Sequence, residues 1–121
     1  MSTESDVKDI GLTEAAMETI RALTGRGWFS SDTAAAKFCM ALAIRAGEPA
    51  GRTEGAKSHW ALGNFDSDFE IRTLLSALYP DDPAPGRLLT HLINRGLEMV
   101  APKVSGAATS TPIDLFEFAS K

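Results

Sequence analysis

The chain has 121 residues, 44% of them hydrophobic and 23% charged, and its formal net charge at pH 7 is −4. These values fit one globular domain and exclude the broad basic surface that is usual for nucleic-acid-binding domains. The single cysteine excludes an intramolecular disulfide, and no apolar run approaches the ~18 residues that a membrane span needs. The polar, acidic start lacks the apolar stretch of a secretory signal, so we expect a cytoplasmic protein.

The first elements along the chain are a short extended segment and a helix. Residues 7–12, VKDIGL, predict the extended segment. A helix is predicted over 14–24, since Thr13 is a suitable N-cap and apolar residues recur at i, i+4 and i+7. The glycines of the following GRG stretch favour the helix end, because glycine readily adopts the left-handed conformation of a C-terminal cap.

A second helix is predicted over 32–46, with Ser30 or Ser31 as its cap. Its side chains are apolar nearly all round, and only Lys37 and Arg45 mark a polar edge. Such a helix must be covered on most sides, so we expect it to be a central helix or a dimer interface. The predicted interface residues are Phe38, Met40, Leu42 and Ile44.

The middle of the chain combines a loop and a third helix. Residues 47–59 are rich in glycine and polar side chains and predict a surface loop, and 60–65 predict a short extended piece. Ser67 and Glu70 fit a capping box that begins a helix, and Pro80 predicts its end. The apolar stripe expected to face the core consists of Ile71, Leu74, Leu75 and Leu78.

A fourth helix is predicted to begin after Asp82, with Pro83 or Pro85 in its first turn, and to end at Pro102. Gly96 lies inside it and costs about 1 kcal/mol relative to alanine. We therefore expect either close helix packing or a helix break at this glycine.

The predicted organisation is a single helical domain over residues 1–104, with a second helical pair at 60–102 and a tail at 105–121. Residues 105–111 have the composition of a flexible linker. Apolar residues then return, and this segment is expected to dock on its own domain, on a neighbouring copy or on another protein. These tail residues are Ile113, Leu115, Phe116 and Phe118.

One polar cluster invites an active-site interpretation. His91, Asn94 and Arg95 lie at i, i+3 and i+4 and so share a helix face. General acid–base catalysis needs a positioned partner and a pocket, and the sequence ties neither to this face. The simpler prediction is a polar face with Arg95 paired to Glu98 or Asp82; phosphate or partner binding is the alternative.

The other polar candidates have structural explanations. Cys39 lies in an apolar stretch and is predicted to be a buried small hydrophobe. The acidic residues around the third helix lack calcium-loop spacing and are predicted to be helix caps. They are Asp66, Asp68, Asp81 and Asp82. We expect no metal site, no cofactor and no catalytic residue.

Residues 7–47 have the element order of a ribbon-helix-helix module, an extended segment followed by two helices. In such modules two chains pair their first strands, and the ribbon enters the DNA major groove. Ser30, Ser31 and Thr33 at a helix start could hold a backbone phosphate. Asp9 in the strand would repel phosphates, so a base-reading repressor or antitoxin remains an alternative only.

The order of motifs also resembles the DndE family of DNA sulfur-modification (phosphorothioation) proteins. The resemblance covers residues 10–104. It consists of Leu12, Ala16, Ile20 and Leu23 in an opening helix, the alanine-rich AAAKFCMALAI segment with its cysteine, and HLINRG at 91–96. It implies a small, mostly helical oligomer without catalytic machinery. It also implies association with DNA, including nicked duplex, beside larger enzymes that modify or cut DNA.

Together these observations predict an all-α domain of four to five helices with a short N-terminal extended segment, assembled as a homo-oligomer. The first functional hypothesis is a non-enzymatic DNA-associated accessory subunit of a modification or defence system. The second is a protein-interaction or assembly module without direct DNA contact. The predicted phosphate contacts are Lys8, Arg26, Ser30, Ser31, Lys37 and Arg95.

Overall fold

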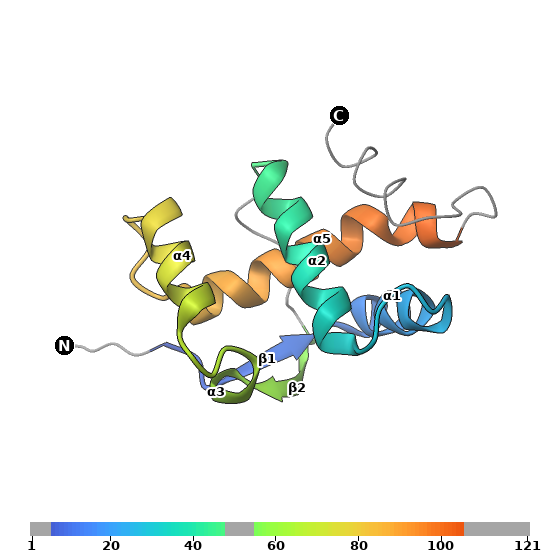
Figure 1. Cartoon of the computed structure of the whole chain (residues 1–121), viewed down its shortest axis with the longest axis horizontal. Helices are drawn as coiled ribbons and strands as arrows, with labels where there is room; N and C mark the ends of the chain where they lie inside the picture. The colour runs from blue at the N-terminus through green and yellow to red at the C-terminus, as the bar shows by residue number, and fades with distance from the viewer. Residues whose placement is uncertain (1–5, 48–54, 106–121) are drawn as a thin grey trace.

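The computed structural model describes residues 6–47 and 55–105, and the predicted partner tail lies outside them. The described part is mainly helical, as predicted, and also contains a two-stranded antiparallel sheet (Figure 1). In chain order the elements are β1 (Asp9–Leu12), α1 (Glu14–Gly25), α2 (Asp32–Arg45), β2 (Lys57–Ala61), α3 (Leu62–Phe65), α4 (Glu70–Leu78) and α5 (Pro85–Ser105). None of the described helices is both long and apolar enough to span a bilayer.

The first strand finds its partner within the chain. β1 pairs antiparallel with β2, with Ile10 opposite Trp60, and the register shifts between Ile10 and Gly11. Ile10 and Leu12 are fully buried, so one face of the ribbon belongs to the core. The predicted loop was wrong at 57–59, which belong to β2, because strand pairing to distant residues overrides local composition. The predicted extended piece at 60–65 is strand at 60–61 only, and 62–65 form α3. The pairing of strands between two chains, as in a ribbon-helix-helix dimer, is not confirmed.

The helices α1 and α2 begin directly after the N-cap residues that the sequence predicted, Thr13 and Ser31. The Thr13 hydroxyl accepts a hydrogen bond from the Ala16 N–H at 3.0 Å. The Ser31 hydroxyl accepts one from the Ala34 N–H at 3.2 Å. These bonds satisfy N–H groups that the first helical turn leaves without a partner.

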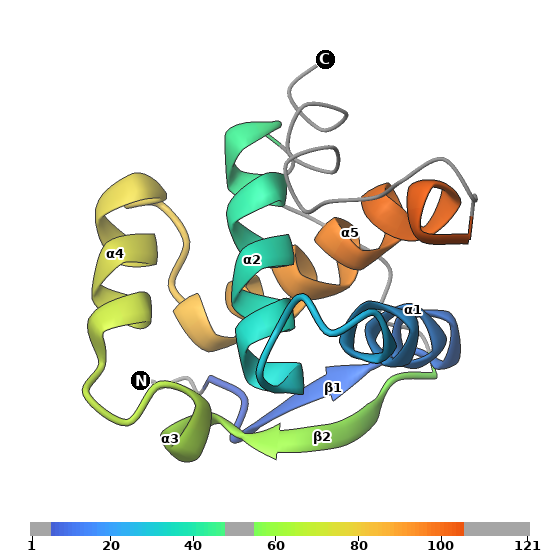
Figure 2. The ribbon, with the colours of Figure 1, turned by 45° about the vertical axis from the view of Figure 1, so that its right-hand side comes forward.

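The central helix is α5, and the expectation that α2 would be central was wrong. Figure 2 shows α5 crossing behind α2 and continuing above α1, and α5 packs against both helices as well as against α4 and β1. Five of its large apolar side chains are fully buried: Leu89, Leu92, Ile93, Leu97 and Val100. α5 covers the inner face of α2, and the other alternative, that α2 forms a dimer interface, stays a prediction.

This packing changes the predicted oligomer interface. Met40 and Leu42 are buried in the core of their own chain, so they are unavailable to a second copy. Phe38 and Ile44 are half-buried and pack at the edge of the core. The apolar character of α2 therefore reflects mostly internal packing.

Gly96 marks the closest approach between α5 and α2. A Cβ atom added there would lie within 2.0 Å of the Cys39 carbonyl oxygen, which no side chain tolerates. The prediction of close helix packing is thus confirmed, and the helix does not break.

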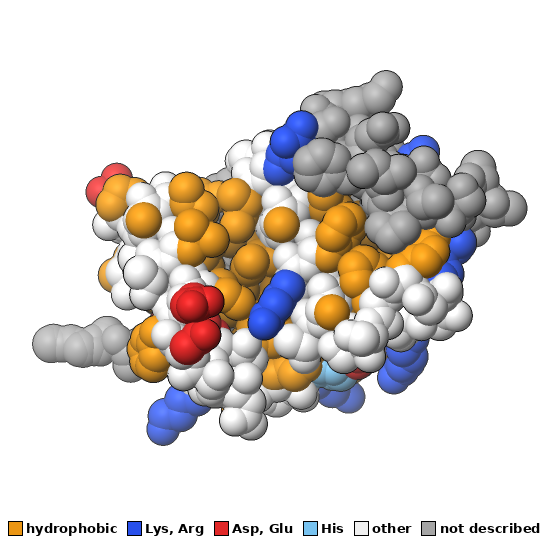
Figure 3. All heavy atoms as spheres, viewed as in Figure 1, with side chains coloured by type: hydrophobic (Ala, Val, Ile, Leu, Met, Phe, Trp, Pro, Cys, Tyr) orange, Lys and Arg blue, Asp and Glu red, His pale blue; other side chains and the backbone are white. Residues whose placement is uncertain are grey.

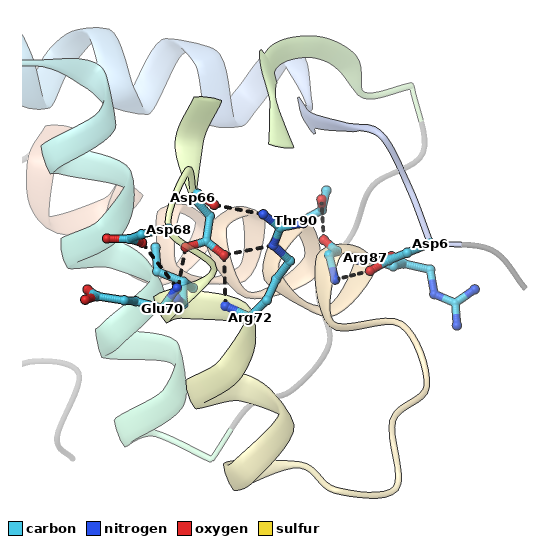
Figure 4. Close-up of polar contacts among 9 residues, drawn as sticks. Asp6, Asp66, Asp68, Glu70, Arg72, Arg87 and Thr90 are labelled. Carbon is cyan, nitrogen blue, oxygen red and sulfur yellow. Dashed lines mark hydrogen bonds and ion pairs between the residues drawn. The ribbon is translucent and has the colours of Figure 1, made fainter. Parts of the chain in front are cut away.

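The two ends of α5 are held by long-range contacts. Pro85 is its first residue, as one alternative predicted, and the Asp6 carboxylate accepts hydrogen bonds from the N–H groups of Gly86 and Arg87 at 2.6 and 2.9 Å (Figure 4). Pro102 does not end the helix, contrary to expectation. The last turn continues because Val104 is buried and its carbonyl oxygen accepts a 2.6 Å hydrogen bond from Arg26 Nη2.

Candidate functional site

The helix α4 is anchored at its start by a buried carboxylate, that of Asp66. This side chain is almost fully buried and accepts hydrogen bonds from the N–H groups of Ile71 at 2.9 Å and Arg72 at 3.0 Å (Figure 4). Arg72 Nε donates to the same carboxylate at 2.9 Å, and Arg72 Nη2 donates to the Asp66 carbonyl oxygen at 2.8 Å. The side chain thus caps the helix and pairs with a cation.

The ionisation of Asp66 is set by this arrangement. Burial alone would raise the pKa of the carboxyl group. The hydrogen bond from Arg72, the two backbone N–H groups and the guanidinium charge outweigh burial, so that the pKa of Asp66 is lowered. The charged form therefore holds α4 in place at neutral pH.

The predicted capping box at Ser67 was wrong. Phe69 directly precedes α4, and its side chain makes no capping hydrogen bond. Ser67 is exposed. Asp66 takes the role instead, and Asp68 adds a 3.2 Å hydrogen bond from the Glu70 N–H. The sequence pattern Ser-x-x-Glu fits a capping box, but an aspartate one residue earlier reaches further and also meets Arg72.

Phe69, directly before α4, points away from the core. Its φ of 63° lies in the left-handed region, and its side chain is 58% exposed. The Arg72 guanidinium lies 3.6 Å from the centre of its ring. The guanidinium thus contacts a ring that is still largely exposed.

The apolar stripe of α4 is only partly used by the chain itself. Leu75 is fully buried and Ile71 is half-buried, as a core-facing stripe predicts. Leu74 and Leu78, on the same stripe, are each 48% exposed. We call Ile71, Leu74 and Leu78 the α4 apolar face. These residues belong to the stripe that was predicted to face the core, but the side of the stripe with Leu74 and Leu78 faces outward.

This apolar face continues toward α2. Figure 3 shows hydrophobic side chains gathered over α4 and between α4 and α2, with acidic side chains at one end of α4 and basic ones over α2. The exposed acidic residues at the start of α4 are Asp68 and Glu70, and Lys37 is exposed on α2. The surface therefore combines apolar area with separated charges, as protein interfaces do.

The predicted phosphate contacts come from four separate parts of the described chain. Lys8 precedes β1, whereas Arg26, Ser30 and Ser31 lie in the connection between α1 and α2. The other two, Lys37 and Arg95, are on α2 and α5.

Several of these side chains have contacts of their own. Arg26 donates to the Val104 carbonyl, the Ser31 hydroxyl caps α2, and Lys37 Nζ lies 5.5 Å from the Phe65 ring centre. Arg95 pairs with Glu98 at 3.3 Å, which confirms one predicted ion pair.

The neighbouring Asn94 has a structural role. It is buried and donates from Nδ2 to the carbonyl oxygens of Gly11 and Thr90, both at 2.9 Å. Its Oδ1 accepts from the Thr13 N–H at 3.1 Å. Two of the three bonds join α5 to β1 and to the N-cap of α1, and the third lies within α5. The Asn94 amide therefore has a structural role, and the His91–Asn94–Arg95 cluster is not a shared site.

Two further features, the cysteine and a surface hollow, were considered as sites. Cys39 is buried, as predicted, and burial raises the pKa of its thiol to about 12. A hollow of about 300 Å³ beside the ribbon is lined by Glu14, Glu18, Arg21 and Lys57 among others. In residues 6–47 and 55–105, no group of three His, Cys, Asp or Glu side chains is arranged to hold a metal ion.

No protein-family model, curated protein or solved structure matches the chain. The resemblance to the DndE family therefore stays a prediction from the motifs.

Proposed function

We propose that this chain is a non-enzymatic protein-interaction module that docks another polypeptide on the α4 apolar face. The observation that carries the proposal is the exposure of Leu74 and Leu78, at 48% each, beside the fully buried Leu75. Fully burying one leucine side chain contributes about 1.5–3 kcal/mol, so covering the exposed halves of two provides a real driving force.

The placement of α4 suits such a role. Asp66 and Arg72 fix the start of the helix through a buried ion pair of 2.9 Å, so the face is presented on a positioned element. Recognition of one helix by another uses apolar anchors at i, i+3, i+4 and i+7. Ile71, Leu74 and Leu78 have this spacing.

A photo-crosslinking amino acid at position 74, introduced in the cells that make the protein, tests the proposal. We expect an adduct between this chain and a second polypeptide from position 74. The same residue at position 76, an exposed serine on the other side of α4, is the matched control and should give little adduct. Equal adducts from both positions, or none from position 74, would reject the docking face.

A second candidate is contact with the DNA backbone, as the resemblance to DNA sulfur-modification proteins implies. The observation that favours it is the position of Lys8 and Lys57, both exposed at the two-stranded ribbon, with Arg21 beside Lys57 in the hollow. Exposed cations on a ribbon suit phosphate contacts, which position a protein without reading sequence.

Fluorescence anisotropy with intact and nicked duplex tests the second candidate. Binding through phosphates should weaken steeply between low and physiological salt. Replacing Lys8 and Lys57 by alanine should reduce both the affinity and the salt slope, whereas Arg87→Ala at the start of α5 should change little. No binding at micromolar protein and low salt would remove DNA contact as a function.

A further inference from the structure

The surface around the α4 apolar face carries both signs of charge on one side of the molecule. Asp68 and Glu70 are exposed at the start of α4, and Lys37 is exposed on α2. Figures 1 and 2 both show α4 and α2 standing next to each other, and Figure 3 shows the acidic and basic side chains on the same face, with apolar side chains between them.

We propose that the polypeptide docked on this face is a second copy of the same chain, related by a two-fold axis. The inference rests on the proposed docking function and names its partner. In a two-fold contact the same patch meets itself, so every contact occurs twice. The acidic start of one α4 then faces Lys37 of the other copy, and the reverse contact is made across the axis.

The apolar part of the patch fits the same arrangement. Leu74 and Leu78 are half exposed on α4, and on α2 Phe38 is half-buried while Ala41 is exposed. Two copies that face each other would cover the leucines of α4 with the outer side of the partner's α2. The net charge of −4 per chain opposes association, so opposite charges at the contact are needed to offset it.

The chain's own tail is a less suitable occupant. It leaves from the end of α5 at Ser105, whereas α4 packs at the other end of that helix, where Leu78 and Leu88 line one hollow. A helix of 21 residues is about 30 Å long. The eight residues from 106 to 113 span about 26–29 Å when fully extended, so Ile113 would barely reach α4, and only the last apolar tail residues, Leu115, Phe116 and Phe118, have length to spare.

Sedimentation equilibrium of the purified full chain over a range of concentrations tests the inference. We expect a monomer–dimer equilibrium whose association constant falls at least tenfold in Leu74→Ser and in Leu78→Ser. The matched control is Ser76→Ala, which alters an exposed side chain on the opposite side of α4 and should leave the constant unchanged.

Charge exchange adds a sharper test. Lys37→Glu and Glu70→Lys should each lower the association constant about tenfold, because a modest surface ion pair is lost twice in a two-fold dimer. The double variant restores opposite charges and should recover most of the wild-type constant. Equal weakening in the double variant would overturn the proposed contact between α4 and α2.

The crosslinker at position 74 separates this inference from the docking function. An adduct of two identical chains supports both. An adduct with a different protein, together with a monomer in sedimentation, overturns the second copy and leaves the docking function standing. An internal crosslink to residues 106–121, or a monomer without any adduct, overturns both.

Discussion

Gly96 is the residue on which the packing of the two largest helices depends. An added Cβ would approach the carbonyl carbon of Cys39 to 2.5 Å and its oxygen to 2.0 Å. Backbone atoms cannot turn away as a side chain can, so α2 and α5 would have to separate. We expect Gly96→Ala to lower the free energy of unfolding by roughly 3 kcal/mol or more, despite alanine's higher helix propensity.

Urea unfolding monitored by circular dichroism measures this loss. Gly63→Ala is the matched control, because that glycine is also helical and nothing lies within 4 Å of an added Cβ. The control should be neutral or slightly stabilising. A Gly96→Ala protein as stable as the control would show that the helices are not in backbone contact.

Asp66 predicts a pH dependence of stability. Its pKa is lowered in the folded state, whereas an unfolded aspartate titrates near about 3.9. A lowered folded-state pKa means that the unfolded chain binds a proton first as the pH falls. The contribution of Asp66 is therefore complete above about pH 4 and is lost as the pH falls through the folded-state pKa.

Asp66→Asn should lower the free energy of unfolding at pH 7 by roughly 2–4 kcal/mol, since it leaves the half-buried Arg72 without its carboxylate. The difference from wild type should shrink between about pH 4 and pH 2, measured by urea titration at each pH. Asp81→Asn, at an exposed position after α4, is the control. A difference that stays constant down to pH 2 would contradict the role of the charge.

At the residue scale, the sequence predicted the contacts that span a few positions. Thr13 and Ser31 cap their helices as expected, because the partners lie three residues away. Asp66 was predicted to be a helix cap, as it is, but its ion pair with Arg72 and the structural role of Asn94 were missed. Asp66 caps from five and six residues before its partners, and Asn94 binds residues more than eighty positions away, a separation that no local pattern encodes.

At the element scale, α4 divides its apolar side chains between core and surface. Leu75→Ala removes a fully buried side chain and should cost about 2–5 kcal/mol of stability. Leu74→Ala removes a half-exposed one and should cost less than about 1 kcal/mol. Urea unfolding at a concentration where the chain is monomeric compares the two, and equal costs would mean that Leu74 belongs to the core rather than to a docking face.

The same division explains why the elements were predicted unevenly. The spacing of Ile71, Leu74, Leu75 and Leu78 predicted a helix, and α4 is one, but spacing does not tell which part of a stripe is covered. Only the last two residues of the strand β2 were predicted to be extended, because its partner, β1, lies some fifty residues earlier. Between α2, which is apolar nearly all round, and the amphipathic α5, composition favoured α2 as the central helix, but it does not tell which helix the others surround.

At the scale of the whole molecule, α5 organises the fold and α4 stands at its edge. α1, α2, β1 and α4 all pack on α5, whereas α4 contributes one fully buried side chain. The other elements therefore form most of the core, and the α4 apolar face is available to the proposed partner. The candidate surface was predictable from the sequence only as an apolar stripe, since its exposure depends on where the other helices stop.

Cys39 reports whether the core opens as one unit. Its thiol is fully buried at the contact between α2 and α5, and burial raises its pKa to about 12. Thiol reagents attack the thiolate, so labelling at pH 8 should require opening of this contact. With an ordinary stability of 5–15 kcal/mol, we expect labelling at least about a thousandfold slower than in the urea-unfolded chain.

Gly96→Ala should raise the labelling rate by the same factor as it raises the equilibrium constant for unfolding, and Gly63→Ala should leave the rate unchanged. The rate would be followed by absorbance with an aromatic disulfide reagent at several urea concentrations. If the contact opens only with the whole fold, the urea dependence of labelling matches that of global unfolding. Fast labelling with a weak urea dependence would instead show that α2 separates from α5 on its own, and α5 would then not hold the molecule together.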